Sequence, residues 1–190
     1  LDRALRIKTN SFRGGVVENI FMRNVRIGEV KEAVLLVDFN YQEGDGGRFT
    51  PVVRNIRLEN MRFVLRDENL MAPTEGIDFM DMELSGIGLN AENFYMEGDS
   101  VSADILSMQA REKSGFELKK FSGEAGFSSR AIVVNGLDLL THRSALNLDL
   151  LFKYPGLHAF NSFLDSVAIS STLRDCQLNL ADIGYFAPEL

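Results

Sequence analysis

Apolar and polar residues alternate with a period of two over much of the chain, which is typical of β-strands with one buried face. The clearest runs cover residues 87–91, 101–105 and 146–152, and turn residues such as Asn135-Gly136 separate runs of this kind. Residues 33–39 are almost continuously apolar, as in a parallel strand that is buried on both faces. The pattern therefore predicts an all-β chain.

One stretch departs from this pattern and predicts a helix. Pro155 can occupy the first turn of a helix, and the apolar residues at 157, 160, 163, 164 and 167 then fall on one face. We expect one short helix near 156–166, with its apolar stripe packed in the core.

A twelve-residue segment occurs twice, at residues 16–27 and again 36 residues later at 52–63, with six identical positions. A fixed internal period of this length is typical of stacked repeats. Asparagines recur at the same places in both copies, so we expect a ladder of stacked amides formed by Asn19, Asn55, Asn24 and Asn60. The repeat predicts right-handed parallel β-helix coils that continue into an extended β-solenoid or meander.

The charge of the chain is unevenly distributed. Residues 1–62 contain 11 basic and 8 acidic residues, whereas residues 63–190 contain 9 basic and 19 acidic residues, within a net charge of −7. This asymmetry predicts two segments with different origins or different partners. The acidic second segment has no basic stripe, which argues against nucleic-acid binding.

Composition limits the kinds of site and segment that we expect. Cys176 is the only cysteine and the chain has two histidines, so we expect no internal disulfide, no metal site and no cofactor. No run approaches the roughly 18 apolar residues of a membrane span. Because the sequence starts with neither a methionine nor the apolar core of a signal peptide, we interpret it as an excerpt of a longer protein.

Arg6 and Lys8 lie two residues apart in an alternating stretch, so both side chains fall on one face of a strand while Ile7 points to the other. Such a pair can hold the carboxylates of an acidic polymer, because arginine binds them through its planar fork and lysine acts as a point charge. A solvated strand face explains the same spacing, and spacing alone favours that interpretation.

Residues 1–62 also carry several motifs of a known family. They are Arg6-Ile7-Lys8, Arg13-Gly14-Gly15, Val17-Glu18-Asn19-Ile20, Asn24-Val25, Asp38-Phe39-Asn40-Tyr41 and Pro51-Val52-Val53-Arg54-Asn55-Ile56. Together they resemble the C-terminal part of the polygalacturonase-type glycoside hydrolases, which cleave pectin and fold as parallel β-helices. The resemblance implies that Arg6 and Lys8 bind the carboxylate and ring of galacturonate, and that Tyr41 contacts the substrate. The implied partner is an acidic polysaccharide, galacturonan.

The same resemblance implies that the catalytic part of such an enzyme is missing. These hydrolases place several aspartates around an attacking water, with room for that water between the carboxylates. The family supplies them from Asn-Thr-Asp, Asp-Asp and Gly-His-Gly motifs, and none of the three occurs here. We therefore expect no catalytic residue, and a glycoside hydrolase ancestry that retains only substrate binding.

The rest of the chain, residues 61–190, carries different motifs. They are Asp67-Glu68-Asn69, Gly76-Ile77-Asp78-Phe79, Asn93-Phe94-Tyr95, Lys113-Ser114-Gly115-Phe116, the stretch 148–154 and the stretch 181–190. These motifs resemble the TamB/AsmA-like envelope proteins of Gram-negative bacteria, in the form found in Bacteroidota. Such proteins cross the periplasm as long β-structures with an apolar groove. The resemblance implies lipid or an outer-membrane assembly partner, and a periplasmic or secreted location.

The two resemblances predict two domains, polygalacturonase-like coils at 1–62 and a TamB/AsmA-like β-rich segment at 63–190. Recombination, design or faulty assembly would each explain such a chimera. One hypothesis is the substrate-binding half of a pectin hydrolase joined to a periplasmic β-segment. The alternative is a non-enzymatic envelope-biogenesis or lipid-transport segment over the whole chain. Because a terminal β-coil exposes unpaired backbone groups, we expect the strands on either side of residue 61 to form one continuous structure.

Overall fold

The computed structural model describes residues 3–28, 33–42, 46–66, 76–78, 81–97, 100–156, 159 and 166–186. These residues form eleven strands and one short helix, so the predicted all-β class is confirmed. The predicted helix near 156–166 lies mostly outside the described residues. The elements are β1 (Arg3–Lys8), β2 (Val16–Arg23), β3 (Arg26–Ile27), β4 (Ala33–Asp38), β5 (Val52–Arg66), β6 (Asp81–Glu97), β7 (Ser100–Glu112), β8 (Glu117–Phe127), β9 (Ala131–Thr141), β10 (Ala145–Lys153), β11 (Ala168–Gln177) and α2 (Leu180–Ile183).

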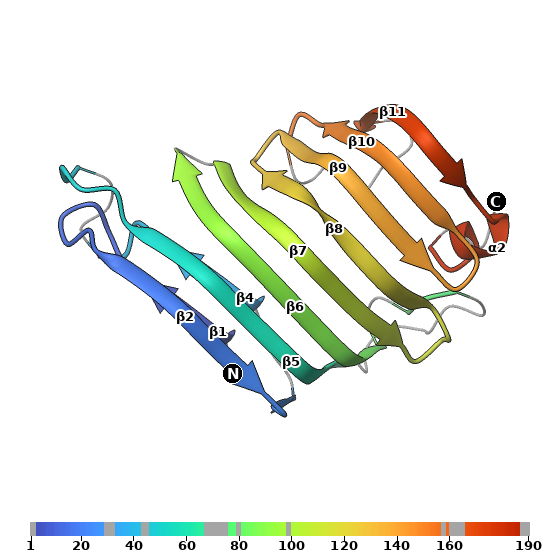
Figure 1. Cartoon of the computed structure of the whole chain (residues 1–190), viewed down its shortest axis with the longest axis horizontal. Coiled ribbons are helices and arrows are strands. Elements are labelled where there is room, and N and C mark those ends of the chain that lie inside the picture. Colours follow the sequence, from blue (N-terminus) through green and yellow to red (C-terminus); the bar gives the residue numbers. More distant parts are fainter. Residues whose placement is uncertain are drawn as a thin grey trace.

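Nine of these strands form one large sheet, and β1 and β4 form a separate two-stranded sheet (Figure 1). The order across the large sheet is β11-β10-β9-β8-β7-β6-β5-β2, and β3 also pairs with β5. From β5 to β11 all neighbours are antiparallel, whereas β2 and β3 pair with β5 in parallel and β1 pairs with β4 in parallel. The turns after β7, β8 and β9 have only three or four residues, which suffices for an antiparallel neighbour but not for a parallel crossover.

The two copies of the sequence repeat lie side by side in β2 and β5. Val16 pairs with Val52 and Ile20 with Ile56, so the pairing offset equals the repeat length. The amide of Asn55 donates to Oδ1 of Asn19 at 3.0 Å. The amide of Asn60 donates to Asn24 at the same distance. All four asparagines have a positive φ, a conformation that asparagine tolerates better than most residues.

These left-handed residues also determine which side chains face the core. In β5, Ile56, Leu58 and Met61 are buried, although strict alternation would place Met61 on the opposite face from Leu58. The sheet register shifts between Leu58 and Met61, where left-handed Asn60 adds one residue to the strand. Such a bulge resets the alternation and returns apolar side chains to the same face.

The main core lies between the two sheets, on the face of the large sheet that we call the inner face. Its buried members come from β1, β3, β5, β6 and the residue that follows β4: Ile7, Ile27, Phe39, Val53, Ile56, Leu58, Met61 and Ile87. A second cluster on the inner face contains Val134, Leu137 and Leu148, packed against Phe121, Leu139, Leu146 and Leu150. All seven of its members come from β8, β9 and β10, so this cluster is formed within one sheet.

Strand β5 crosses the predicted boundary at residues 62 and 63 without interruption. It pairs with β2 on one side and with β6 on the other, so the strands before and after residue 61 belong to one sheet, as the sequence predicts. The chain exposes 11915 Å². A compact protein of this size exposes about 9,000 Å², and the excess is the consequence of a wide, thinly covered sheet.

Candidate functional site

The inner face of the large sheet is the most extensive candidate site. Opposite residues of an antiparallel pair lie on the same face, and from β5 to β11 apolar residues on this face pair with apolar residues. Examples of these pairs are Leu58–Leu89, Leu89–Met108, Phe121–Leu139, Leu150–Val134 and Leu148–Leu173. The pairing therefore produces one apolar surface that spans many strands.

Large apolar side chains on this inner face remain exposed toward β11. Leu173 is 65% exposed and Ile169 is 54% exposed, and Phe127 on β8 is also exposed. Leu173 pairs with Leu148 and Ile169 pairs with Phe152, which places both on the inner face. Contiguous exposed apolar surface on a folded protein marks a binding or interaction surface.

The opposite face, which we call the outer face, carries ladders of charge between neighbouring strands. The ion pairs include Arg54–Glu18 at 2.6 Å, Arg62–Glu83 at 2.7 Å and Lys120–Asp138 at 2.6 Å, and Arg174 pairs with Asp149. Each exposed pair contributes about 0–1 kcal/mol to stability. Their larger effect is to make the sheet strongly amphipathic.

Glu59 is a carboxylate of the outer face that is paired with two arginines. It accepts from Nε of Arg23 at 2.5 Å and from Nε of Arg57 at 2.6 Å. The hydrogen bond from Arg23 is the main cause of its lowered pKa; desolvation opposes it, and the charges of both arginines assist it. This carboxylate is therefore already satisfied and is a poor candidate for an acid or a base.

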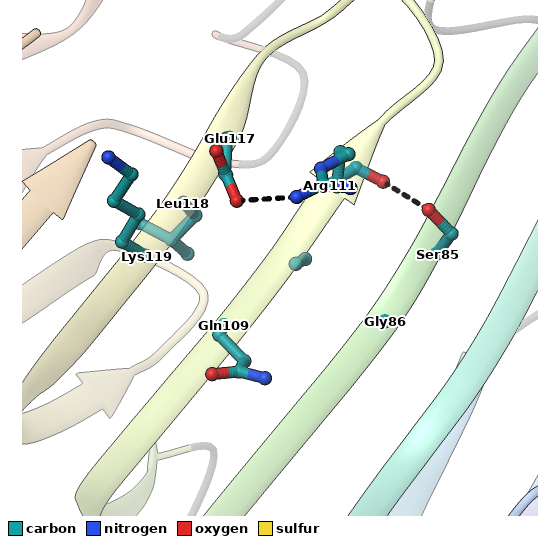
Figure 2. Close-up of a pocket in the computed structure, with 8 residues that line it drawn as sticks. Ser85, Gly86, Gln109, Arg111, Glu117, Leu118 and Lys119 are labelled. Carbon is teal, nitrogen blue, oxygen red and sulfur yellow. Dashed lines mark hydrogen bonds and ion pairs between the residues drawn. The ribbon is translucent and has the colours of Figure 1, made fainter. Parts of the chain in front are cut away.

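A shallow depression of about 410 Å³ lies on the outer face across β6, β7 and β8 (Figure 2). Arg111 donates to Glu117 at 2.8 Å within it, and the hydroxyl of Ser85 donates to the backbone oxygen of Arg111. Gly86 leaves one side of it without a side chain. An adjoining depression of about 280 Å³ shares Gln109 and Lys119 with it. Both are open and polar, and their carboxylates are already ion-paired.

The substrate-binding residues predicted from the sequence lie together on the two-stranded sheet and the turn after it. The guanidinium carbon of Arg6 lies 5.3 Å from the ring centre of Tyr41, and Nζ of Lys8 lies 4.2 Å from it. Ile7 is buried on the opposite side of β1. Such distances are typical of cation–π contacts.

Asp38 is the member of this cluster that sequence reasoning missed. Nη2 of Arg6 donates to Oδ2 of Asp38 at 2.6 Å, so one of the two cations is already paired with a carboxylate. The pairing of β1 with β4 places Lys8 opposite Asp38 at an offset of 30 residues, which differs from the 36-residue repeat. The repeat therefore gave no signal for this contact.

A buried polar cluster occurs where the C-terminal helix meets the turn between β9 and β10. The hydroxyls of Thr141 and Ser144 donate to Oδ2 of Asp182 at 2.5 and 2.6 Å, and the backbone N–H of Asn179 donates to Ser144. One oxygen of Asp182 thus accepts from two hydroxyls. The cluster is a clasp that holds α2 against the sheet.

Two further kinds of site are not found in the described part of the chain. No group of histidine, cysteine, aspartate and glutamate side chains there could hold a metal ion. No helix there is long and apolar enough to cross a bilayer.

In comparisons with known proteins, neither a protein-family model, nor a curated protein, nor a solved structure matches this chain.

Proposed function

We propose that this chain is a non-enzymatic lipid-handling segment of an envelope protein, in which the inner face of the large sheet binds acyl chains. The observation that supports it is the separation of an apolar inner face, with Phe127, Ile169 and Leu173 exposed, from a charged outer face. The resemblance of residues 61–190 to TamB/AsmA-like proteins supports the same class and a periplasmic location.

The dimensions of the inner face suit this role. Adjacent strands are about 4.8 Å apart, so the four intervals from β7 to β11, which the N-terminal strands leave uncovered, span about 19 Å. One leaflet of a bilayer has a hydrocarbon depth of about 15 Å, so whole acyl chains fit across this face. Each methylene of an acyl chain that leaves water contributes about 0.8 kcal/mol to binding. A broad apolar surface can therefore bind acyl chains without specific polar contacts.

The N-terminal strands support a second part of the proposal, which concerns the architecture of residues 3–66. The parallel pairs β1–β4 and β2–β5 have the arrangement of two stacked coils, and we take residues 3–66 as parallel β-helix coils that continue into the antiparallel meander. In this arrangement the coils cover one end of the inner face with the main core. The lipid-binding part is then the region from β7 to β11.

Lipid binding can be tested with a fluorescent phospholipid presented in detergent micelles. The variant Ile169→Glu/Leu173→Glu places two charges on the inner face, and Phe21→Glu/Leu140→Glu places two on exposed apolar positions of the outer face. We expect the first variant to lose most of the bound lipid and the second to bind like the parent chain. Equal binding by both variants, or no binding by the parent, would contradict the proposal.

A second function, binding of galacturonan, is favoured by one observation at the other sheet. Arg6 and Lys8 gather around the Tyr41 ring, which is a suitable surface for a sugar that carries a carboxylate. Titration calorimetry with oligogalacturonate should show weaker binding for Arg6→Ala/Lys8→Ala than for the parent. Arg48→Ala/Lys153→Ala removes the same charge elsewhere and serves as the control, and an equal loss in both variants would refute a specific site.

A further inference from the structure

We propose that one rim of the large sheet docks on the surface of an anionic phospholipid bilayer. The rim consists of the ends of β2, β5, β6, β7, β8, β9, β10 and β11 that lie along the upper side of the sheet in Figure 1. Four exposed aromatic residues mark it, and we call them the aromatic rim: Phe12, Phe49, Tyr95 and Phe127. This inference rests on the proposed lipid-handling function and names the surface from which the lipid is taken.

The strand register places these residues at one end of the sheet. Phe12 lies in the turn before β2, and Phe49 lies in the connection before β5, where Val16 and Val52 pair. Val53 pairs with Phe94, so Tyr95 belongs to the same end. Phe127 pairs with Val101 at the start of β7. Of the six exposed aromatics in the described residues, four therefore occur at this rim; Phe21 and Phe186 lie elsewhere.

The turns that carry Phe12 and Phe49 are held rigidly against each other. The backbone N–H of Phe49 donates to the carbonyl of Ser11 at 2.9 Å, and the N–H of Gly47 donates to the Ser11 hydroxyl at 2.8 Å. A Cβ on Gly14 would lie 2.5 Å from Cβ of Phe49, so glycine is needed for this approach. Phe49 is nevertheless 62% exposed. Its exposure thus comes from a turn that is already ordered, so little conformational freedom has to be lost on docking.

Cations accompany the aromatic rim. Arg13 and Arg48 lie in the same two turns, Arg130 lies in the turn between β8 and β9, and Lys153 ends β10 beside it; all four are exposed. The described residues of these turns, 9–15, 46–51 and 128–130, contain no aspartate or glutamate. Glu43, Asp45 and Asp99 belong to rim connections but lie outside the described residues. Aromatic residues favour the bilayer interface, and basic residues favour anionic headgroups.

The rim also connects the bilayer to the inner face. A row of paired residues on that face runs along it: Val101, Phe127, Ile132, Phe152 and Ile169. A lipid that leaves a bilayer beneath the rim would meet this row first, and its acyl chains would pass from hydrocarbon to apolar side chains. Docking in this orientation therefore gives the lipid-binding face an entrance.

The sequence contains no tryptophan, so a single introduced tryptophan reports only on the position at which it is placed. Phe49→Trp places the probe at the rim, and Phe21→Trp places it on the outer face near the other end of β2. With vesicles of equimolar phosphatidylcholine and phosphatidylglycerol, we expect a blue shift and quenching by brominated lipid for Phe49→Trp only. A Phe21→Trp signal equal to it, or no signal at Phe49→Trp, would overturn the inference.

Vesicle sedimentation with paired variants measures the contribution of each element. Phe12→Ser/Phe49→Ser should bind the anionic vesicles at least about tenfold more weakly, because two aromatic side chains no longer leave water. Leu178→Ser/Leu180→Ser changes two exposed apolar residues at the opposite end of β11 and should bind like the parent. Equal loss in both variants would contradict docking through this rim.

The basic residues of the rim are tested by the same sedimentation assay. A detergent control then distinguishes a failure of the docking proposal from a failure of the lipid-handling proposal. Arg48→Gln/Arg130→Gln/Lys153→Gln should weaken binding by about fivefold per charge, whereas Arg26→Gln/Lys119→Gln/Arg143→Gln should not. Equal binding to vesicles of phosphatidylcholine alone would refute the selection of anionic lipid. The rim variants should still bind phospholipid in detergent; if the parent fails in detergent but docks on vesicles, the lipid-handling proposal is wrong and the docking surface stands.

Discussion

Asn55 combines two roles that a pair of substitutions can separate. Its backbone is left-handed, with φ of 55°, and its amide donates to Asn19 at 3.0 Å on the neighbouring strand β2. Asn55→Gly keeps the left-handed backbone without steric cost but removes the amide. Asn55→Ala removes the same amide and also places a Cβ in the left-handed region. The difference in stability between the two variants therefore measures the backbone contribution.

The expected magnitudes follow from these two terms. The lost hydrogen bond is worth about 1 kcal/mol, and glycine adds about 0.5–1 kcal/mol through the entropy of the unfolded chain, so Asn55→Gly should cost about 1.5–2 kcal/mol. For Asn55→Ala the strain of the left-handed region is about 1–2 kcal/mol in addition to the lost bond, so the total should be about 2–3 kcal/mol.

Urea unfolding followed by circular dichroism measures both values, provided that the dependence on urea is the same in all variants. The control is Asn135→Ala on β9, because Asn135 is exposed and its φ is not positive. An exposed substitution of that kind changes stability by less than about 0.5 kcal/mol. If Asn55→Ala proves more stable than Asn55→Gly, the left-handed backbone is not maintained in solution and the register of β2 with β5 is in doubt.

Three more outcomes are expected. The chain should release no reducing sugar from polygalacturonate above a boiled control, because the sequence lacks the catalytic motifs of polygalacturonase-type hydrolases; measurable release would contradict this. Burial, the largest single influence, raises the pKa of Glu112, but hydrogen bonds from Ser114 and from the backbone N–H groups of Glu83 and Lys113 together outweigh it, so the pKa lies below its ordinary value of 4.5. The stability that ionised Glu112 contributes should therefore be lost as the pH falls below about 4.5. Glu112→Gln should flatten the pH dependence of the urea unfolding midpoint in that range, and an unchanged pH dependence would contradict this role of Glu112. Asp182→Ala should cost about 1–3 kcal/mol by leaving two hydroxyls without their acceptor, and hydrogen exchange should increase first at residues 178–186; unchanged exchange there would refute the clasp.

The all-β class and the pairing register of β2 with β5 could be predicted from the sequence, because each produces a periodic pattern of residues. Alternation with a period of two is a property of any half-buried strand. In a stack of repeats, equivalent residues lie side by side, so the 36-residue period is also the offset that pairs Val16 with Val52. Arg6 and Lys8 share a face for the same elementary reason, since two residues separate them on one strand.

The direction of the later strands and the partner of Arg6 could not be predicted in this way. Parallel and antiparallel strands have the same period, so the alternation from residue 81 onward fits a solenoid and a meander equally well. The decisive signal is the length of the connections, such as residues 113–116 and 142–144, which are too short for a crossover. Asp38 meets Arg6 because β1 and β4 pair at an offset of 30 residues, and no repeated motif marks that offset.

The left-handed residues explain how the sheet keeps two chemically different faces along strands as long as β5 and β6, which have 15 and 17 residues. One extra residue in a strand turns every later side chain to the opposite face. In β5, apolar residues resume at Met61 because Asn60 supplies that extra residue; without it, Met61 would point outward and Arg62 would point into the core. Gly86 occupies a similar left-handed position in β6, where the register also shifts. The amphipathic character on which the proposed lipid binding depends therefore resides as much in these few backbone positions as in the apolar residues themselves.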